Sequence, residues 1–193
     1  MVKAKRRTVV IATAVAVVLL GAALAATLLT RGNSTSGETT SDGVVTYDVG
    51  HRPLAPDATE KSLTGSTIKL DSYRGKTVVL NFWGSWCPPC QDEASTFAAL
   101  DAQYSKQGIA FLGDDVQDTP TNALGFTHRY GITYPSFNDP GYLVAQDFTQ
   151  AGVLVKDPPT TVVIDKTGHV VGTIFGEALY SQVTTLINDA AVS

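Results

Sequence analysis

A strand-like segment that leads directly into two cysteines is the feature that most constrains the fold of this chain. Residues 77–83, TVVLNFW, are mostly apolar and include β-branched members, as in a strand buried on both faces. Residues 86–90, WCPPC, follow after two residues and open a segment with helical spacing, 90–107, which Gly108 ends. The only two cysteines of the sequence therefore stand where a buried strand ends and a helix begins.

The residue types at this junction favour thiol chemistry. Cys87 lies at the helix N-terminus, where unpaired N–H groups and the helix dipole favour a thiolate. Pro88 and Pro89 suit the first helical turn, whose N–H groups need no partner within the helix. Cys90, three residues on, returns to the same side and can close a disulfide with Cys87. We expect Cys87 to attack a partner disulfide and Cys90 to resolve the mixed disulfide.

Three other interpretations of the cysteine pair are weaker. Two cysteines cannot complete a four-ligand zinc site, and the three histidines (His51, His128 and His169) are scattered along the sequence, so no metal site is predicted. A disulfide across three residues closes a small loop and would stabilise the fold only modestly. A pair of inert core cysteines is disfavoured by the two prolines and the tryptophan beside them.

The rest of the pattern alternates strands and helices. Expected strands are 66–70, 77–83, 109–112 and a hairpin of 160–165 with 169–175; expected helices are a single turn at 71–75 and then 90–107, 120–130, 141–148 and 178–191. Two strands joined by a crossover helix are parallel, and the closing hairpin is antiparallel. The sequence therefore predicts an α/β domain with a mixed central sheet and helices on both faces.

The N-terminal segment indicates a membrane anchor. Residues 1–7 are basic and expected in the cytoplasm, and residues 8–30 carry no charge. A helix over 8–30 would be about 35 Å long, enough to cross a hydrocarbon core of about 30 Å. By the positive-inside rule, the Gly/Ser/Thr-rich linker 31–43 and the domain 44–193 would then lie outside the cytoplasm. The alternative is a signal peptide cleaved after Ala23-Leu24-Ala25, which would release a secreted protein.

The charge of the chain limits its partners. Residues 1–31 hold five basic residues and no acid, so the remaining nine basic residues stand against all 18 acidic ones. An acidic body repels phosphate backbones, and we therefore expect no nucleic-acid binding. We also expect a monomer without a cofactor.

Several motifs together resemble the TlpA/ResA-like branch of the thioredoxin superfamily. They are Arg74-Gly75-Lys76, the run VVLNFWGSWCPPC at 78–90, RPLAPD at 52–57 and PTTVVID at 159–165, and the similarity spans roughly residues 50–190. The resemblance implies a thioredoxin-like fold and an extracytoplasmic, often membrane-anchored thiol-disulfide oxidoreductase acting on protein thiols and disulfides. It favours a reductant fed by a membrane electron donor, for instance in cytochrome c maturation. A disulfide-forming oxidant is the alternative direction.

The resemblance also assigns roles to residues. Cys87 matches the attacking cysteine, Cys90 the resolving cysteine, and Pro159 the cis-proline that seats the substrate backbone. The implied substrate-binding set is Trp86, Pro88, Pro158, Pro159 and Thr160. The chain departs from the pattern at Pro158, which has no N–H to offer to a bound peptide, and this suggests a restricted partner.

An acidic residue near the cysteines is also implied. Counting back from Tyr130-Gly131-Ile132 places it at Asp118, with Asp114 and Asp115 as neighbours. Asn81 stands where thioredoxin has a buried aspartate, so Asp118 is the candidate for relaying the proton of the resolving thiol. The alternative is that Asp118 is a solvated acid or a helix cap before Thr119-Pro120.

Two other functions are open to a chain of this kind. The thiolates of Cys87 and Cys90 could serve a metal-handling module, for example for copper, although related folds in that role usually space the cysteines by three residues and add a histidine. A peroxidase of the wider thioredoxin-like group would need a peroxidatic cysteine in a different local motif, which the sequence lacks.

Overall fold

The computed structural model describes residues 37–40 and 42–192. The expected cytoplasmic segment 1–7 and anchor 8–30 lie outside the described residues. Within the described part, no helix combines the length and the apolar character that crossing a membrane requires.

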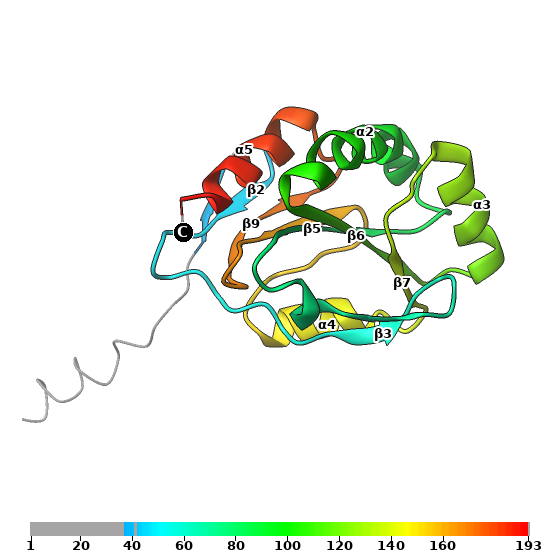
Figure 1. Ribbon diagram of the computed structural model, residues 1–193, viewed down its shortest axis with the longest axis horizontal. Helices are drawn as coiled ribbons and strands as arrows, with labels where there is room; N and C mark the ends of the chain where they lie inside the picture. The colour runs from blue at the N-terminus through cyan, green and yellow to red at the C-terminus, as the bar shows by residue number, and fades with distance from the viewer. Residues whose placement is uncertain (1–36, 41, 193) are drawn as a thin grey trace, which may run out of the picture. The chain divides into compact units, whose positions relative to one another are not determined.

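A mixed sheet forms the centre of the domain (Figure 1). Its strand order is β1-β2-β9-β8-β5-β6-β7; β5 pairs in parallel with β6, β6 in parallel with β7, and all other neighbours are antiparallel. The strands are β1 (Glu38–Thr39), β2 (Val44–Thr46), β5 (Thr77–Trp83), β6 (Ile109–Val116), β7 (Ser136–Asp139), β8 (Thr160–Ile164) and β9 (Val170–Phe175). A separate antiparallel hairpin consists of β3 (Thr59–Lys61) and β4 (Thr67–Lys69).

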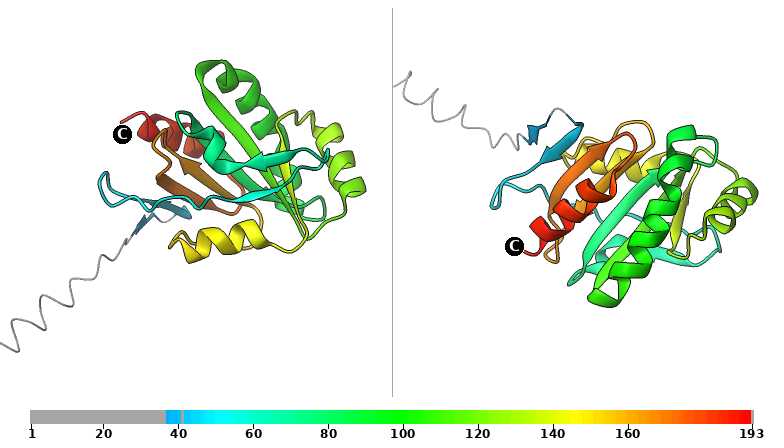
Figure 2. Two further views of the ribbon diagram at one scale, coloured as in Figure 1. Left: turned by 60° about the horizontal axis from the view of Figure 1, so that its bottom comes forward. Right: turned by 90° about the horizontal axis from the view of Figure 1, so that it is seen from above.

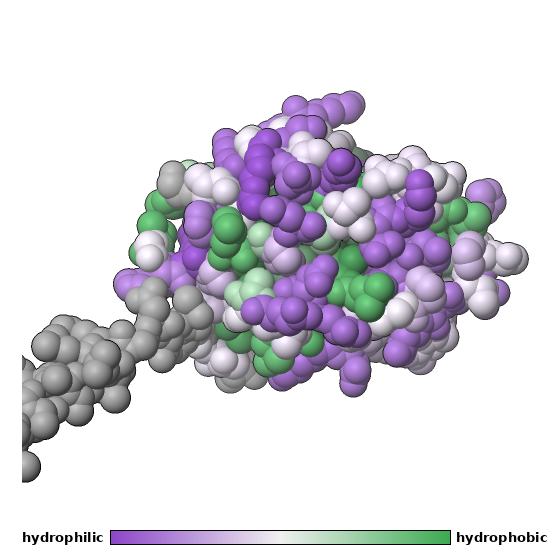
Figure 3. Space-filling view, turned by 90° about the horizontal axis from the view of Figure 1, so that it is seen from below, coloured by the Kyte–Doolittle hydropathy of each residue, from purple (hydrophilic) through white to green (hydrophobic). Residues whose placement is uncertain are grey.

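Helices cover both faces of the sheet (Figure 2). The helices α2, α3 and α5 pack on one face, while α4 and the β3–β4 hairpin lie against the other. The helical segments are η1 (Leu70–Tyr73), α2 (Pro88–Tyr104), η2 (Ser105–Gln107), α3 (Pro120–Tyr130), α4 (Leu143–Gln150) and α5 (Tyr180–Ala190). On the α4 side the molecular surface is mixed, with hydrophobic groups scattered among hydrophilic ones (Figure 3). The thioredoxin-like α/β fold is confirmed.

The central strand explains why the sheet forms where it does. All seven residues of β5 are buried, because the strand lies between β8 and β6 and under helices on both sides. Burying its apolar side chains supplies the main favourable term, at about 25 cal/mol for each Å² removed from water. The end of β5 is therefore held in place on every side, and the cysteines follow it directly.

Several expected boundaries differ from the structure. The sheet starts before residue 44, since Glu38–Thr39 within the expected linker pairs with β2. The strand expected at 109–112 continues to Val116, because its polar end is still paired with β5 and β7. The helix expected at 90–107 begins at Pro88, ends at Tyr104 and continues as η2 to Gln107.

Four strands were not predicted at all: β1, within the expected linker, and β2, β3 and β7, which lie outside the expected elements of the domain. The helix expected at 141–148 runs from Leu143 to Gln150. Its start is set by the Asp139 carboxylate, which accepts the Leu143 and Val144 N–H groups, both at 2.8 Å. The helix at 120–130 is confirmed residue for residue.

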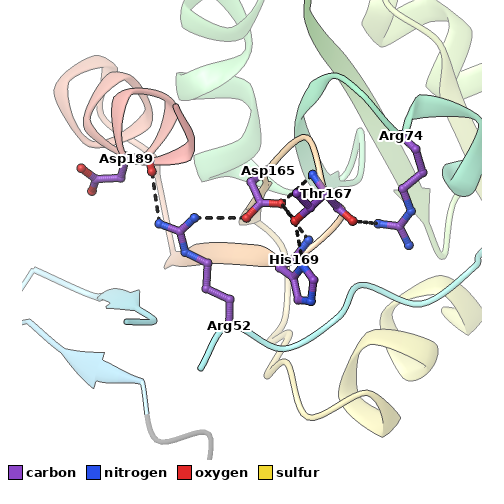
Figure 4. A network of polar contacts seen from close by, with 6 residues as sticks. All are labelled: Arg52, Arg74, Asp165, Thr167, His169 and Asp189. Carbon is purple, nitrogen blue, oxygen red and sulfur yellow. Dashed lines mark hydrogen bonds and ion pairs between the residues drawn. The ribbon is translucent and has the colours of Figure 1, made fainter. Parts of the chain in front are cut away.

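A buried ion pair between Arg52 and Asp165 lies at the end of the sheet opposite the cysteines (Figure 4). Arg52 Nη1 lies 3.1 Å from Asp165 Oδ2, and Arg52 Nη2 donates to the Asp189 carbonyl of α5 at 3.1 Å. The second oxygen of Asp165 accepts the N–H groups of Thr167 and His169 in the β8–β9 turn. The segment before β3, the closing hairpin and the last helix are thereby joined at one point.

Candidate functional site

The two cysteines sit where the sequence predicts them, at the junction of β5 and α2. Cys87 is the N-cap of α2, Pro88 and Pro89 open its first turn, and Cys90 lies within that turn. The two sulfurs form a disulfide with the Cα atoms 5.3 Å apart. The Cys90 N–H donates to Cys87 Sγ at 3.3 Å. In the reduced protein, this N–H and the helix dipole would stabilise a Cys87 thiolate.

The loop before β8 faces Cys87 from across the site. The Pro158–Pro159 peptide bond is cis, and the Pro158 carbonyl oxygen lies 3.5 Å from Cys87 Sγ. Thr160 is buried, and its hydroxyl donates to the Lys156 and Asp157 carbonyls. The Thr160 side chain thus shapes the loop, and the loop places the Pro158 carbonyl beside the attacking sulfur.

An exposed aromatic residue, Trp86, directly precedes Cys87. Trp86 is 49% exposed, yet its position is held, because Nε1–H donates to the Val116 carbonyl at 3.2 Å. The ring covers Gly84, where any side chain would collide with it. Pro88 is also exposed. Trp86 and Pro88 therefore flank Cys87 in the chain, and the loop of Pro158 contacts its sulfur; whether the predicted residues bind substrate stays a prediction.

Asp118 lies next to the cysteine loop and accepts hydrogen bonds from two backbone N–H groups. Its Oδ2 accepts the Ser85 N–H at 2.9 Å and its Oδ1 the Thr119 N–H at 2.7 Å. Partial burial pushes the pKa of Asp118 upward, but these hydrogen bonds outweigh it and leave the pKa below its ordinary value. Asp118 is therefore a carboxylate that orders the loop before Cys87; its catalytic role stays a prediction.

Glu93 is the buried acid that the sequence interpretation missed. It lies one helical turn after Cys90, on the same side of α2, and is 2% exposed. Asn81 Nδ2 of β5 donates to Oε1 at 2.8 Å, and the Ala178 N–H donates to Oε2 at 2.7 Å. Burial raises the pKa of Glu93 to about 7, although both hydrogen bonds act to lower it.

A signal for Glu93 was present in the sequence. Its position falls in the apolar stripe of α2, one residue before Ala94 and four before Phe97. A carboxyl on a buried stripe near two cysteines has to be hydrogen-bonded or neutral. The polar Asn81 in the buried strand was its partner, and the two were not connected in the sequence interpretation.

Asp114 and Asp115, the acidic neighbours of Asp118 in the sequence, are fully buried in β6. Because side chains alternate along a strand, they face opposite sides of the sheet. Burial raises the pKa of Asp114 well above its ordinary value and that of Asp115 to about 8. Among the described residues, no group of three or more His, Cys, Asp and Glu side chains is arranged to hold a metal ion.

Comparison with known proteins agrees with this geometry. Residues 52–173 match the model of the AhpC/TSA family. The chain is 39% identical over 122 residues to the thiol-disulfide oxidoreductase ResA of Geobacillus thermodenitrificans, covering 63% of this chain and 67% of that protein. It is 34% identical over 128 residues to ResA of Bacillus thuringiensis strain Al Hakam, covering 66% and 71%.

Solved structures show the same fold. A DsbF homologue from Corynebacterium diphtheriae superimposes with a TM-score of 0.72 at 28% identity, covering 81% of this chain and 99% of that chain. A secreted thiol-disulfide isomerase from Corynebacterium glutamicum gives the same TM-score and identity over 81% and 98%. The chain therefore belongs to the AhpC/TSA family, in the TlpA/ResA-like branch of the thioredoxin superfamily, and is a thiol-disulfide oxidoreductase.

Proposed function

We propose that this enzyme is tethered to the cell membrane with its catalytic domain outside the cytoplasm, where it reduces disulfides of exported proteins. The observation that carries the exchange chemistry is the disulfide at the start of α2, with Glu93 one turn below Cys90. The location is supported by the basic residues before the uncharged segment 8–30. The reducing direction is supported by the resemblance to the TlpA/ResA-like branch.

Each step of the reaction has a group to carry it. The Cys87 thiolate attacks a substrate disulfide, one substrate sulfur leaves as a thiolate, and a mixed disulfide forms. Glu93, with a pKa of about 7, takes the proton of Cys90. The Cys90 thiolate then attacks Cys87 Sγ, and the second substrate sulfur leaves. The substrate has gained two electrons, and the enzyme holds the Cys87–Cys90 disulfide.

The spent enzyme has to be reduced again. A membrane protein that passes electrons outward fits this requirement, because the tether would keep the disulfide close to the membrane surface. Pro158 narrows the choice of substrate, since it offers the carbonyl beside Cys87 but no N–H for strand-like pairing. A restricted set of substrate proteins, such as those whose disulfides are reduced in cytochrome c maturation, is consistent with this restricted peptide binding.

The reduction potential of the full-length protein tests the direction. The protein in detergent is equilibrated in thiol–disulfide buffers, and its free cysteines are then alkylated. A potential well below about −220 mV supports a reductant, and one near about −120 mV reassigns the protein to disulfide formation. A protein that forms no disulfide in any buffer would contradict redox chemistry and leave the metal-handling alternative.

The location is tested separately in intact cells. A protease added to spheroplasts should digest the domain while the N-terminal tag of a tagged chain stays protected. Recovery of the domain from the culture medium would instead support a cleaved signal peptide.

A further inference from the structure

A group of buried polar atoms behind the cysteines has no hydrogen-bond partner among the described residues. Native proteins pair nearly all such atoms, and an exception calls for a bound water or a functional reason. On the helix α3 side of the sheet the unpaired atoms are Trp83 Nε1, both carboxyl oxygens of Asp115, Ser136 Oγ and Asn138 Oδ1.

These atoms converge on one place. Trp83, Asp115 and Asn138 are in register on the parallel strands β5, β6 and β7, so their side chains share a face of the sheet. A side chain at Gly113 would collide with both Trp83 Nε1 and Ser136 Oγ, so these two atoms meet above its bare backbone. We call this region, lined by Trp83, Asp115, Ser136 and Asn138, the polar chamber.

The polar chamber adjoins the cysteines through two contacts. Trp83 packs in one cluster with Cys87 and Cys90 and stacks on Phe126 of α3 with the ring centres 4.5 Å apart. Asp118, whose charge acts on Asp115, accepts the N–H of Ser85, two residues before Cys87. Asp115 is thus linked to the cysteines through Trp83, its partner in the β5–β6 pairing, and through Asp118.

The electrostatic surroundings decide when Asp115 can ionise. Burial, followed by the negative charges of Asp118 and Asp139, raises the pKa of Asp115 to about 8. In the cluster around Trp83, α3 contributes Ala123, Phe126 and the titratable Tyr130, and the start of α2 contributes Ala94 and the two cysteines. A disulfide adds no charge, whereas a thiolate at Cys87 adds one in a region of low dielectric.

We propose that Asp115 is a positioning residue of the exchange reaction. In the reduced protein Asp115 keeps its proton, so that Cys87 can carry a negative charge. In the oxidised protein, where the two sulfurs are joined, Asp115 can lose that proton. The inference rests on the proposed thiol–disulfide exchange. The coupling is reciprocal: a thiolate at Cys87 raises the pKa of Asp115, and an ionised Asp115 raises the pKa of Cys87 by the same amount.

The proton balance makes the proposal measurable. Reduction breaks the S–S bond with two electrons from a buffer dithiol, which becomes a disulfide. Cys90 takes one of the protons released by the buffer dithiol. Above about pH 8, where Asp115 of the oxidised protein has ionised, reduction also draws one proton from solvent to Asp115. The equilibrium constant for reduction should therefore fall more steeply with pH than it does without Asp115.

The test compares the full-length wild-type protein with Asp115→Asn and Asp114→Asn in detergent. The equilibrium constant for reduction by a buffer dithiol is measured from pH 6 to pH 10. We expect the ratio of wild type to Asp115→Asn to stay constant below about pH 7 and to fall above pH 8, by up to about tenfold per pH unit. Asp114→Asn is the matched control, since Asp114 is the adjacent buried carboxyl on the opposite face. The charges of the two carboxyls interact, but Asp114→Asn keeps Asp115 and should therefore keep the additional fall above pH 8.

A constant ratio for Asp115→Asn over the whole range would overturn the proposal, and so would an equal change in Asp114→Asn. If Asp115→Asn does not fold, Asp118→Asn replaces it. Removing the Asp118 charge should move the bend of the curve to lower pH, and an unmoved bend contradicts the coupling. The proposed function is judged by whether the disulfide exchanges at all, and this inference by the shape of the pH curve, so the two can fail separately.

Discussion

Replacing Glu93 with glutamine should remove one defined part of the pH dependence of stability. Burial raises the pKa of Glu93 from an ordinary 4.5 to about 7. The folded state therefore keeps a proton that the unfolded state has lost, and stability falls as the pH rises between these values. Each unit of pKa difference corresponds to about 1.4 kcal/mol, so ionisation of Glu93 lowers the free energy of unfolding by about 3 kcal/mol above pH 7. The full stability is present below pH 4.5.

Glutamine fits the site without this cost. Its side-chain oxygen can accept the Ala178 N–H, and the Asn81 amide can turn to present oxygen to the new NH₂ group. The Thr161 hydroxyl, now an acceptor from Asn81, can become the donor. Glu93→Gln should therefore match the wild-type stability near pH 5 to within about 1 kcal/mol and exceed it by about 3 kcal/mol at pH 8.

The assay is urea unfolding of both oxidised full-length proteins in a non-ionic detergent, at intervals from pH 5 to pH 8.5. Asp114 and Asp115 are present in both proteins, so the difference between the two free energies of unfolding isolates Glu93. A difference that does not change with pH would refute the reasoning, because Glu93 would then not be a buried acid with a raised pKa.

The remaining predictions concern the cysteines and the opposite end of the sheet. Cys90→Ser should accumulate mixed disulfides through Cys87, visible on non-reducing gels, while Cys87→Ser should form far fewer; equal trapping by both would argue against distinct attacking and resolving roles. Arg52→Met should lower the free energy of unfolding by about 3–5 kcal/mol, because the Asp165 carboxylate stays buried without its ion-pair partner Arg52. A denaturation midpoint near that of the wild type would disprove this. Gly168→Ala should lower the free energy of unfolding by about 1 kcal/mol or more, because φ at Gly168 is +91° and the Arg74 guanidinium occupies the space of a side chain. Gly125→Ala, in an open part of α3, is the control and should leave the free energy of unfolding unchanged or raise it by up to about 1 kcal/mol.

Local patterns carried much of the fold. The apolar run of β5, the prolines after Cys87 and the helix at 120–130 are signals contained within a few residues, and the structure has the expected strand or helix at each, although α2 begins two residues earlier than expected. β7, with the sequence SFND, has no run of β-branched residues. It is a strand because β6 offers it an edge to pair with, which is a property of the assembled sheet.

The sequence by itself therefore determined the position and spacing of the cysteines and the class of reaction, because strand, prolines and helix start are adjacent in the chain. Only the tertiary structure decided which acids stand near them. Glu93 has its raised pKa because Ala178, 85 residues away, and Asn81 of β5 close over it. Asp115 differs from Asp118 because the strand pairing buries one carboxyl and leaves the other beside backbone N–H groups. Burial and hydrogen bonding set a pKa, and both arise from residues brought together by the fold.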